Sequence, residues 1–245
     1  MEALRTERIY KHFGGLQVLN DLSITVEKGE RLALIGPNGA GKTTLFNVLS
    51  GELRVSDGKI FLFGQEITHT PVHQRAHLGI SRSFQIIRLP FHLSVQENIL
   101  LALHGMSRSR YEMFRPTSNY SLIMEKAREK LDQIDLWDKR QQPVKDLSYG
   151  EQRKLAIALS LAQEPRLLLL DEPNAGLDIV EMPAFTQAVK TLTKGTTTIF
   201  AAHDMDLIFS LADRILVLYF GQIIAQGTPT EIQNHPKVRE IYLGT

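Results

Sequence analysis

The segment at residues 36–44 has the composition and spacing of a phosphate-binding loop. It reads Gly-Pro-Asn-Gly-Ala-Gly-Lys-Thr-Thr, follows the apolar run 31–35 and opens the helical pattern 42–49. Glycines at a strand-to-helix turn let successive backbone N–H groups close around an anion, and the helix N-terminus adds its positive dipole end. Lys42 supplies a mobile charge for the β- and γ-phosphates of a nucleotide, and the Thr43 hydroxyl is a ligand for Mg²⁺. The expected nucleotide-binding residues of this loop are Gly36, Pro37, Asn38, Gly39, Ala40, Gly41, Lys42, Thr43 and Thr44.

Polar residues also stand where several predicted strands end. Asp171 and Glu172 follow four consecutive leucines, Gln85 ends the strand-like segment 79–85, and His203 follows the β-branched segment 196–202. Ligands of open α/β sheets gather at the carboxyl ends of the strands, so we expect these residues and Gly36 to border one crevice. Asp171 is placed to hold Mg²⁺, and Glu172 to orient and deprotonate an attacking water. An isolated Asp-Glu pair would instead favour a solvent-facing strand end, but the complete phosphate loop favours the functional interpretation.

Composition limits the other classes of function. The 245 residues contain 28 Lys+Arg and 27 Asp+Glu, a balance that shows no nucleic-acid footprint, and we expect no nucleic-acid partner. The chain has no cysteine, which excludes disulfides and thiolate metal sites. The charged N-terminus does not resemble a signal peptide, and no apolar run is long enough to span a membrane. Any membrane role is therefore expected to be peripheral.

The distribution of strand and helix patterns predicts an α/β fold. Segments 4–10 and 22–26 are strand-like and suggest a small antiparallel sheet before the phosphate loop. Capping signals and apolar spacing predict helices at 98–103, 121–134 and 152–162, and a helix that starts with Thr70 as N-cap and Pro71 as first residue. We therefore expect residues 1–245 to form a single domain, with 1–85 and 165–245 as the α/β core and 86–164 as a helical subdomain.

Three other features permit two interpretations each. His69, His73 and His77 recur at helical spacing and could ligate a metal, but without a carboxylate or cysteine a solvated face is favoured. On composition alone, Phe13 is a core residue rather than a stacking platform for a base. Ser148, followed by Glu151, is the N-cap of a capping box, although a glycine-bearing turn before a helix also suits phosphate.

Taken together, the motifs resemble those of ABC-transporter ATP-binding subunits. The resemblance rests on the phosphate loop, Gln85, Leu-Ser-Tyr-Gly-Glu-Gln at 147–152, Leu-Leu-Leu-Leu-Asp-Glu-Pro at 167–173, Asn-Ala-Gly-Leu-Asp at 174–178 and His203, which follow the family's order and spacing from about residue 10 to 205. It implies a P-loop NTPase core with a mostly parallel sheet, an N-terminal antiparallel β-subdomain and an inserted helical subdomain.

The resemblance also implies roles for individual residues. Phe13 matches the aromatic residue that stacks on adenine, in place of the core interpretation. Lys42, Gln85, Glu172 and His203 match catalytic positions, with Glu172 as the base and His203 as the switch histidine. Thr43, Gln85 and Asp171 are the implied Mg²⁺ ligands. Ser148, Gly150 and Glu151 match the signature positions that contact ATP held by the opposite subunit. The loop that crosses the dimer interface corresponds to Asn174, Ala175, Gly176, Leu177 and Asp178.

Three residues depart from the commonest family pattern. Tyr149 replaces the first signature glycine, Glu151 replaces a glutamine, and Asn174 replaces a serine. The first two variants resemble those of amino-acid importers. The replacement at Asn174 puts the usual hydrogen bond across the subunit interface in doubt.

The implied function is an Mg²⁺-dependent ATP hydrolase that powers transport through a separate membrane permease. It would bind ATP, pair with a second ABC ATPase subunit, identical or paralogous, and lie in the cytoplasm against the inner face of the membrane.

A narrower resemblance is to importers of branched-chain amino acids, and it rests on segments 81–89, 108–120, 147–154 and 238–244. Lipopolysaccharide-export and urea-import ATPases share several of these features, and a non-transport ABC ATPase or a small-molecule kinase remain alternatives. The apolar, irregular segment 86–93 is expected to line a groove for a permease helix, or else to pack between the α/β core and the helical subdomain.

Overall fold

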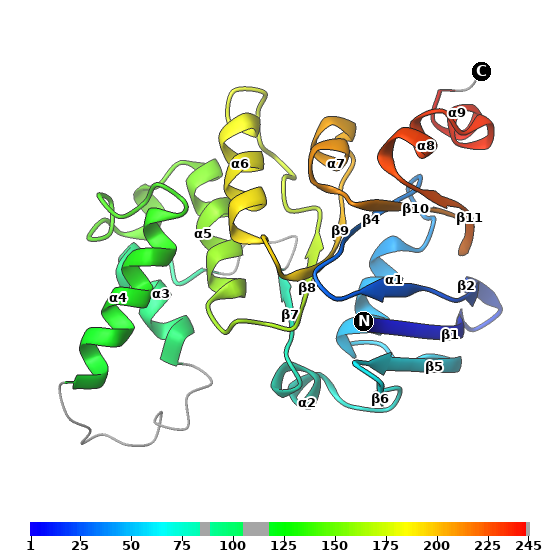
Figure 1. The fold of residues 1–245 in the computed structure, drawn as a ribbon, viewed down its shortest axis with the longest axis horizontal. Helices are drawn as coiled ribbons and strands as arrows, with labels where there is room; N and C mark the ends of the chain where they lie inside the picture. The colour runs from blue at the N-terminus through cyan, green and yellow to red at the C-terminus, as the bar shows by residue number, and fades with distance from the viewer. Residues whose placement is uncertain (84–88, 105–117, 244–245) are drawn as a thin grey trace. The chain divides into compact units, whose positions relative to one another are not determined.

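The computed structural model describes residues 1–83, 89–104 and 118–243 (Figure 1). The chain divides into two compact units, one of Met1–Arg82, Arg166–Glu172 and Gly195–Thr245, the other of Ser83–Pro165 and Pro173–Lys194. Gln85, residues 86–88 of the expected permease groove and residues 108–117 of the importer-like segment 108–120 lie outside the described residues. We refer to the two units as the core unit and the helical unit.

The central sheet of the core unit carries the ends of four expected site strands. Within the described residues its strand order is β11-β10-β4-β9-β8-β7, and β10, β4, β9 and β8 are mutually parallel. The strands are β4 (Arg31–Ile35), β7 (Ile80–Ser83), β8 (Leu167–Asp171), β9 (Thr197–Ala201), β10 (Arg214–Tyr219) and β11 (Gln222–Gly227). Every residue of β8 and β9 is buried, which explains their continuous apolar sequences, because a parallel sheet covered on both faces has no polar side.

A second, antiparallel sheet forms the N-terminal part of the core unit. Its order is β2-β1-β5-β6, and β3 also pairs with β1. The strands are β1 (Glu2–Phe13), β2 (Leu16–Leu22), β3 (Thr25–Glu27), β5 (Asp57–Leu62) and β6 (Gln65–Glu66). The predicted single strand 22–26 is wrong, because the chain bends around Thr6. The Thr6 hydroxyl donates a hydrogen bond to Leu22 O and accepts one from Ile24 N, which separates β2 from β3.

Short helices complete the core unit: α1 (Lys42–Ser50), α2 (Val72–His77), α7 (Met205–Leu211), α8 (Pro229–Gln233) and α9 (Pro236–Leu243). Helix α2 begins later than predicted, with Pro71 rather than Thr70 as N-cap, since Pro71 has extended dihedral angles and its carbonyl accepts from Gln74 N and Arg75 N. The side chains of His69, His73 and His77 are exposed. Among the described residues, no group of three His, Cys, Asp or Glu side chains could hold a metal ion.

The helical unit contains α3 (Val95–His104), α4 (Ser118–Asp132), a 3-10 turn at Val144–Asp146, α5 (Tyr149–Leu161) and α6 (Met182–Leu192). Helix α5 packs against α6, and α3 packs against α4 and α5. Residues Pro173–Lys194 therefore group with these helices, whereas the sequence-based division had placed them in the core. No helix in the described ranges has both the length and the apolar content that a membrane crossing needs.

Candidate nucleotide site

The phosphate loop follows β4 and can be formed only by glycines at its two ends. A Cβ on Gly36 would lie 2.2 Å from the carbonyl oxygen of Leu218 in β10. Gly41 is the N-cap of α1 with φ of +105°, and a Cβ there would lie 2.9 Å from Leu19 Cδ2. Because side chains are excluded at both points, the loop backbone approaches β10 and β2 closely and leaves the helix N-terminus open to an anion.

Lys42, the first residue of α1, turns back onto the loop. Its Nζ donates to Gly36 O at 2.6 Å and to Pro37 O at 3.1 Å, and the residue is only 7% exposed. Burial lowers the pKa of Lys42, while the charges of Glu172 and Asp171 act to raise it. The predicted phosphate-binding lysine therefore lies close enough to the two predicted carboxylates for their charges to affect its pKa.

Asp171 ends β8 as a buried carboxylate with a buried cationic partner. Arg82 Nη2 lies 3.0 Å from Asp171 Oδ2, and Arg82 Nη1 donates to Asn47 Oδ1 at 2.6 Å and to Ser50 Oγ at 3.2 Å in α1. Burial raises the pKa of Asp171, and the charge and hydrogen bond of Arg82 oppose that rise. Arg82 therefore ties the strand-end carboxylate to the helix that carries the phosphate loop. The sequence interpretation missed this residue, although it lies three positions before Gln85.

Glu172 and His203 lie together at the ends of neighbouring strands. Glu172 Oε1 is 3.0 Å from His203 Nε2, with the two side chains 21% and 53% exposed. Glu172 has a φ of +48°, a left-handed conformation that is unfavourable for a residue with a side chain, and its backbone N donates to Ala201 O at 2.9 Å. Strain of this kind is common where a side chain must be aimed at a ligand. The predicted base and the predicted switch histidine are thus partners in the structure.

Phe13 lies at the end of β1, on the turn that leads to β2. Its side chain is 46% exposed, and Lys11 Nζ lies 4.9 Å from its ring centroid. The interpretation of Phe13 as a core residue is therefore wrong, since Phe13 is the last residue of β1 and nearly half of its side chain is exposed. An exposed aromatic face is what base stacking needs.

The residues fit a nucleotide with Mg²⁺. The glycines of the loop leave its backbone N–H groups accessible to phosphate. Lys42, whose ammonium group lies against the loop, supplies a positive charge for the phosphates. Thr43, the next residue, is exposed and carries a hydroxyl group. Together with the Asp171 carboxylate it provides the oxygen ligands that Mg²⁺ prefers.

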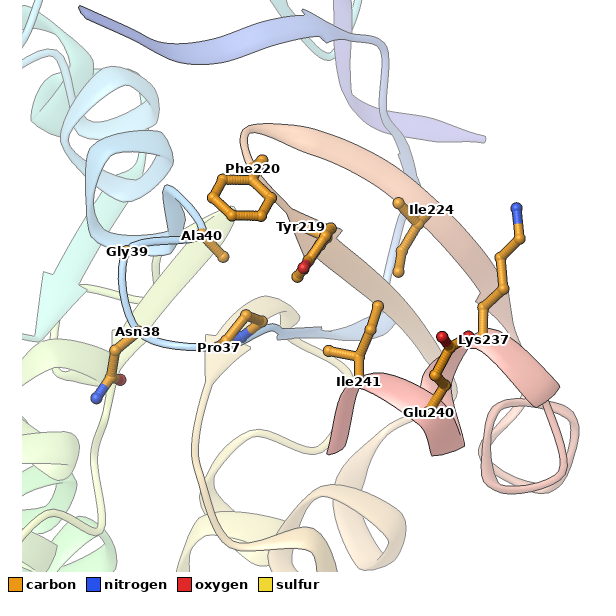
Figure 2. Close-up of a pocket in the computed structure, with 10 residues that line it drawn as sticks. All are labelled: Pro37, Asn38, Gly39, Ala40, Tyr219, Phe220, Ile224, Lys237, Glu240 and Ile241. Atoms are coloured by element: carbon orange, nitrogen blue, oxygen red, sulfur yellow. The ribbon is translucent and has the colours of Figure 1, made fainter. Parts of the chain in front are cut away.

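A pocket of about 740 Å³ adjoins the phosphate loop (Figure 2). One wall is formed by loop residues and the other by the turn between β10 and β11 and by α9, whose role the sequence had not indicated. The residues that line it are Pro37, Asn38, Gly39, Ala40, Tyr219, Phe220, Ile224, Lys237, Glu240 and Ile241. The phosphate loop is therefore flanked by the C-terminal segment.

In the helical unit, the predicted signature turn forms the N-terminus of α5. Ser148 Oγ accepts from Glu151 N at 3.2 Å and Glu151 Oε2 accepts from Ser148 N at 3.0 Å, which confirms the capping box. Burial acts to raise the pKa of Glu151, but hydrogen bonds from Lys139 and Ser148 outweigh it and hold that pKa below its usual value. Between Ser148 and Glu151, the backbone N–H of Gly150 donates to Glu181 Oε1 at 3.0 Å. The turn therefore already holds an anionic oxygen.

Comparison with known proteins identifies the family of this site. The sequence profile of the ABC transporters matches residues 19–175. The chain belongs to the ABC transporter family. A profile described as branched-chain amino acid ATP-binding cassette transporter matches residues 222–245. Membership makes the chain an ATP-binding cassette ATPase, and it confirms the predicted α/β P-loop fold.

Individual relatives match along the whole chain. A probable branched-chain amino acid transport ATP-binding protein, LivG, of Archaeoglobus fulgidus is 37% identical over 100% of this chain and 96% of its own length. The high-affinity LivG of Salmonella typhimurium is 36% identical over 98% of this chain and 97% of its length. Among solved structures, the ADP conformation of an ATP-binding cassette of an ABC transporter superposes with a TM-score of 0.84 at 32% identity and covers both chains completely.

Proposed function

We propose that this chain is the Mg²⁺-dependent, ATP-hydrolysing subunit of an importer of branched-chain amino acids. The assignment of ATP hydrolysis rests on the Glu172–His203 pair, whose Oε1 and Nε2 atoms lie 3.0 Å apart. The charges of Asp171 and Glu172 also act on Lys42 of the phosphate loop, where they raise its pKa against the effect of burial. The solute is inferred from the full-length likeness to LivG proteins and from the C-terminal match at residues 222–245.

Hydrolysis would rely on positioning and charge. The loop N–H groups and Lys42 bind the phosphates, and adenine stacks on Phe13. Thr43, Asp171 and Gln85 would hold Mg²⁺, which would supply positive charge against the β- and γ-phosphates. Glu172 orients and deprotonates the water, and His203 holds both the Glu172 carboxylate and the transferred phosphoryl group in line.

A second subunit would complete the site. The capped turn of Ser148, Gly150 and Glu151 offers a helix N-terminus to the γ-phosphate bound by its partner, where a phosphate oxygen would replace the Glu181 carboxylate on Gly150 N. Residues 174–178 cross the interface beside it. Ile179 and Val180, immediately after this loop, are 90% and 85% exposed, which suits a surface that a partner covers.

The remaining partner would be an integral-membrane permease, with this chain in the cytoplasm on the membrane surface. Residues 89–93 of the expected contact segment lie within the described residues, and the Phe91 side chain among them is 37% exposed. ATP-driven closure of the two ATPase subunits would then reach the permease through the helical unit.

The direct test is uptake by the assembled transporter. Proteoliposomes that contain this chain, its permease, its partner ATPase and its solute-binding protein should accumulate labelled leucine when ATP is supplied at the face that carries this chain. Labelled urea serves as the control solute. ATP-dependent uptake of urea with no uptake of leucine would overturn the solute assignment, and failure to hydrolyse ATP would overturn the enzymatic one.

A further inference from the structure

We propose that Tyr149 is a positioning residue that fastens the loop 174–178 to the signature helix α5. The inference rests on the proposed function, in which both segments act on the partner's nucleotide. The Tyr149 hydroxyl donates to the backbone carbonyl oxygen of Ala175, the second residue of the loop, at 3.0 Å. A signature residue thus holds the interface loop of its own subunit.

Arg153, one turn further along α5, bonds to both partners of this contact. We call the arrangement of Tyr149, Arg153 and the Ala175 carbonyl the clamp. Its Nη2 donates to the Tyr149 hydroxyl at 2.5 Å and to Ala175 O at 2.9 Å, and its guanidinium lies 5.0 Å from the Tyr149 ring centroid. Arg153 is 5% exposed whereas Tyr149 is 41% exposed. A buried, charge-assisted donor therefore fixes the tyrosine hydroxyl in the direction of the loop carbonyl.

The loop follows the tyrosine ring closely. Gly176 has a φ of +84°, and a Cβ at that position would lie 3.0 Å from Tyr149 Cε1. Only glycine adopts this conformation without strain and leaves room for the ring. The ring and the loop are thus packed in direct contact.

A second connection joins the far end of the loop to the same helix. Asp178 Oδ1 accepts from Glu181 N at 2.8 Å, and the Glu181 carboxylate accepts from Gly150 N. Loop residues are therefore held to α5 at Ala175 and, through Glu181, at Gly150. The consequence is that the signature turn and the loop approach the partner's ATP as one body, so that correct placement of one places the other.

The clamp can be tested with Tyr149→Phe, which keeps the ring and removes the hydroxyl. Loss of hydrogen bonds of this kind should lower the kcat for ATP of the assembled transporter by about two- to tenfold, because the loop is less well placed at the instant of reaction. The KM for ATP should not change. Tyr10→Phe is the matched control, since Tyr10 lies in β1 of the core unit and belongs neither to the loop nor to α5.

A direct readout of loop order avoids dependence on activity. The chain has no cysteine, so Ile179→Cys, at a 90% exposed position directly after the loop, accepts a single nitroxide label. The electron paramagnetic resonance spectrum should show faster label motion with Tyr149→Phe, intermediate motion with Arg153→Lys and no change with Tyr10→Phe. Unchanged motion and unchanged kcat with Tyr149→Phe would overturn the clamp, as would an equal effect of Tyr10→Phe. If the native transporter failed to hydrolyse ATP, the proposed function would fail, but the spectra would still decide about the clamp.

Discussion

Replacing Arg82 by methionine removes the cation that compensates the buried Asp171 carboxylate. The Arg82 side chain is 9% exposed and that of Asp171 is 4% exposed, with 3.0 Å between Nη2 and Oδ2. Arg82 Nη1 also lies 3.2 Å from Glu52 Oε2. Breaking a buried ion pair from one side costs about 3–5 kcal/mol, because the remaining charge stays desolvated. We expect Arg82→Met to lower the free energy of unfolding by about this amount.

The assay is urea unfolding followed by circular dichroism, with Arg31→Met as the matched control. Arg31 pairs with Asp213 at 3.0 Å, but the Asp213 side chain is 46% exposed, so the expected loss is about 0–1 kcal/mol. Asp171→Asn in the Arg82→Met background should restore part of the stability, since it removes the uncompensated charge.

We also expect the stability loss of Arg82→Met to depend on pH. Burial already raises the pKa of Asp171 above its usual value, and removal of Arg82 takes away an effect that lowers it. A carboxyl group with a raised folded-state pKa binds protons preferentially in the folded state, so its energetic cost falls as the pH falls. The deficit of Arg82→Met should therefore shrink in acid. Equal losses for Arg82→Met and Arg31→Met at neutral pH would refute the reasoning.

Two further predictions concern stability. Arg75 donates to five backbone carbonyls at 2.7–3.0 Å, and burial lowers its pKa only to about 10, so it stays charged at neutral pH. Arg75→Met should cost about 3–5 kcal/mol in urea unfolding by leaving these carbonyls unpaired, and a loss below about 1 kcal/mol would contradict this. Glu151 has a folded-state pKa below its ordinary 4.5, so its stabilising contribution should be complete near neutral pH and lost as the pH falls through that folded-state pKa. The stability difference between the native chain and Glu151→Gln should close in acid, and a difference that widened would be inconsistent.

Much of the candidate site could be predicted because its chemistry lies at strand ends. An apolar run followed by a polar residue marks the carboxyl end of a buried strand, and this pattern located Gly36, Asp171 and His203. The capping box at Ser148 was equally visible, because its two partners lie within four residues of sequence. Local patterns of this kind need no knowledge of distant contacts.

The missed features depend on contacts between distant segments. Arg75 and Arg82 are charged residues in polar stretches, and their burial follows from α1 and β8, which lie far away in sequence. Helix α6 was not predicted, although Pro183 near its start and the spacing of Phe185, Val189 and Leu192 were available signals. Without α6, the link from Glu181 to the signature turn could not be foreseen.

The most direct test of the central claim is the nucleotide retained by the assembled transporter when every copy of this chain carries Glu172→Gln. The amide keeps the size of the side chain but cannot accept the proton of water, and loss of a general base typically slows a reaction about 10²–10⁴-fold. We predict slow turnover with unhydrolysed ATP bound to this chain after a Mg²⁺-ATP incubation, where the native transporter retains ADP. Near-native turnover, with ADP bound to the Glu172→Gln chain, would contradict the account.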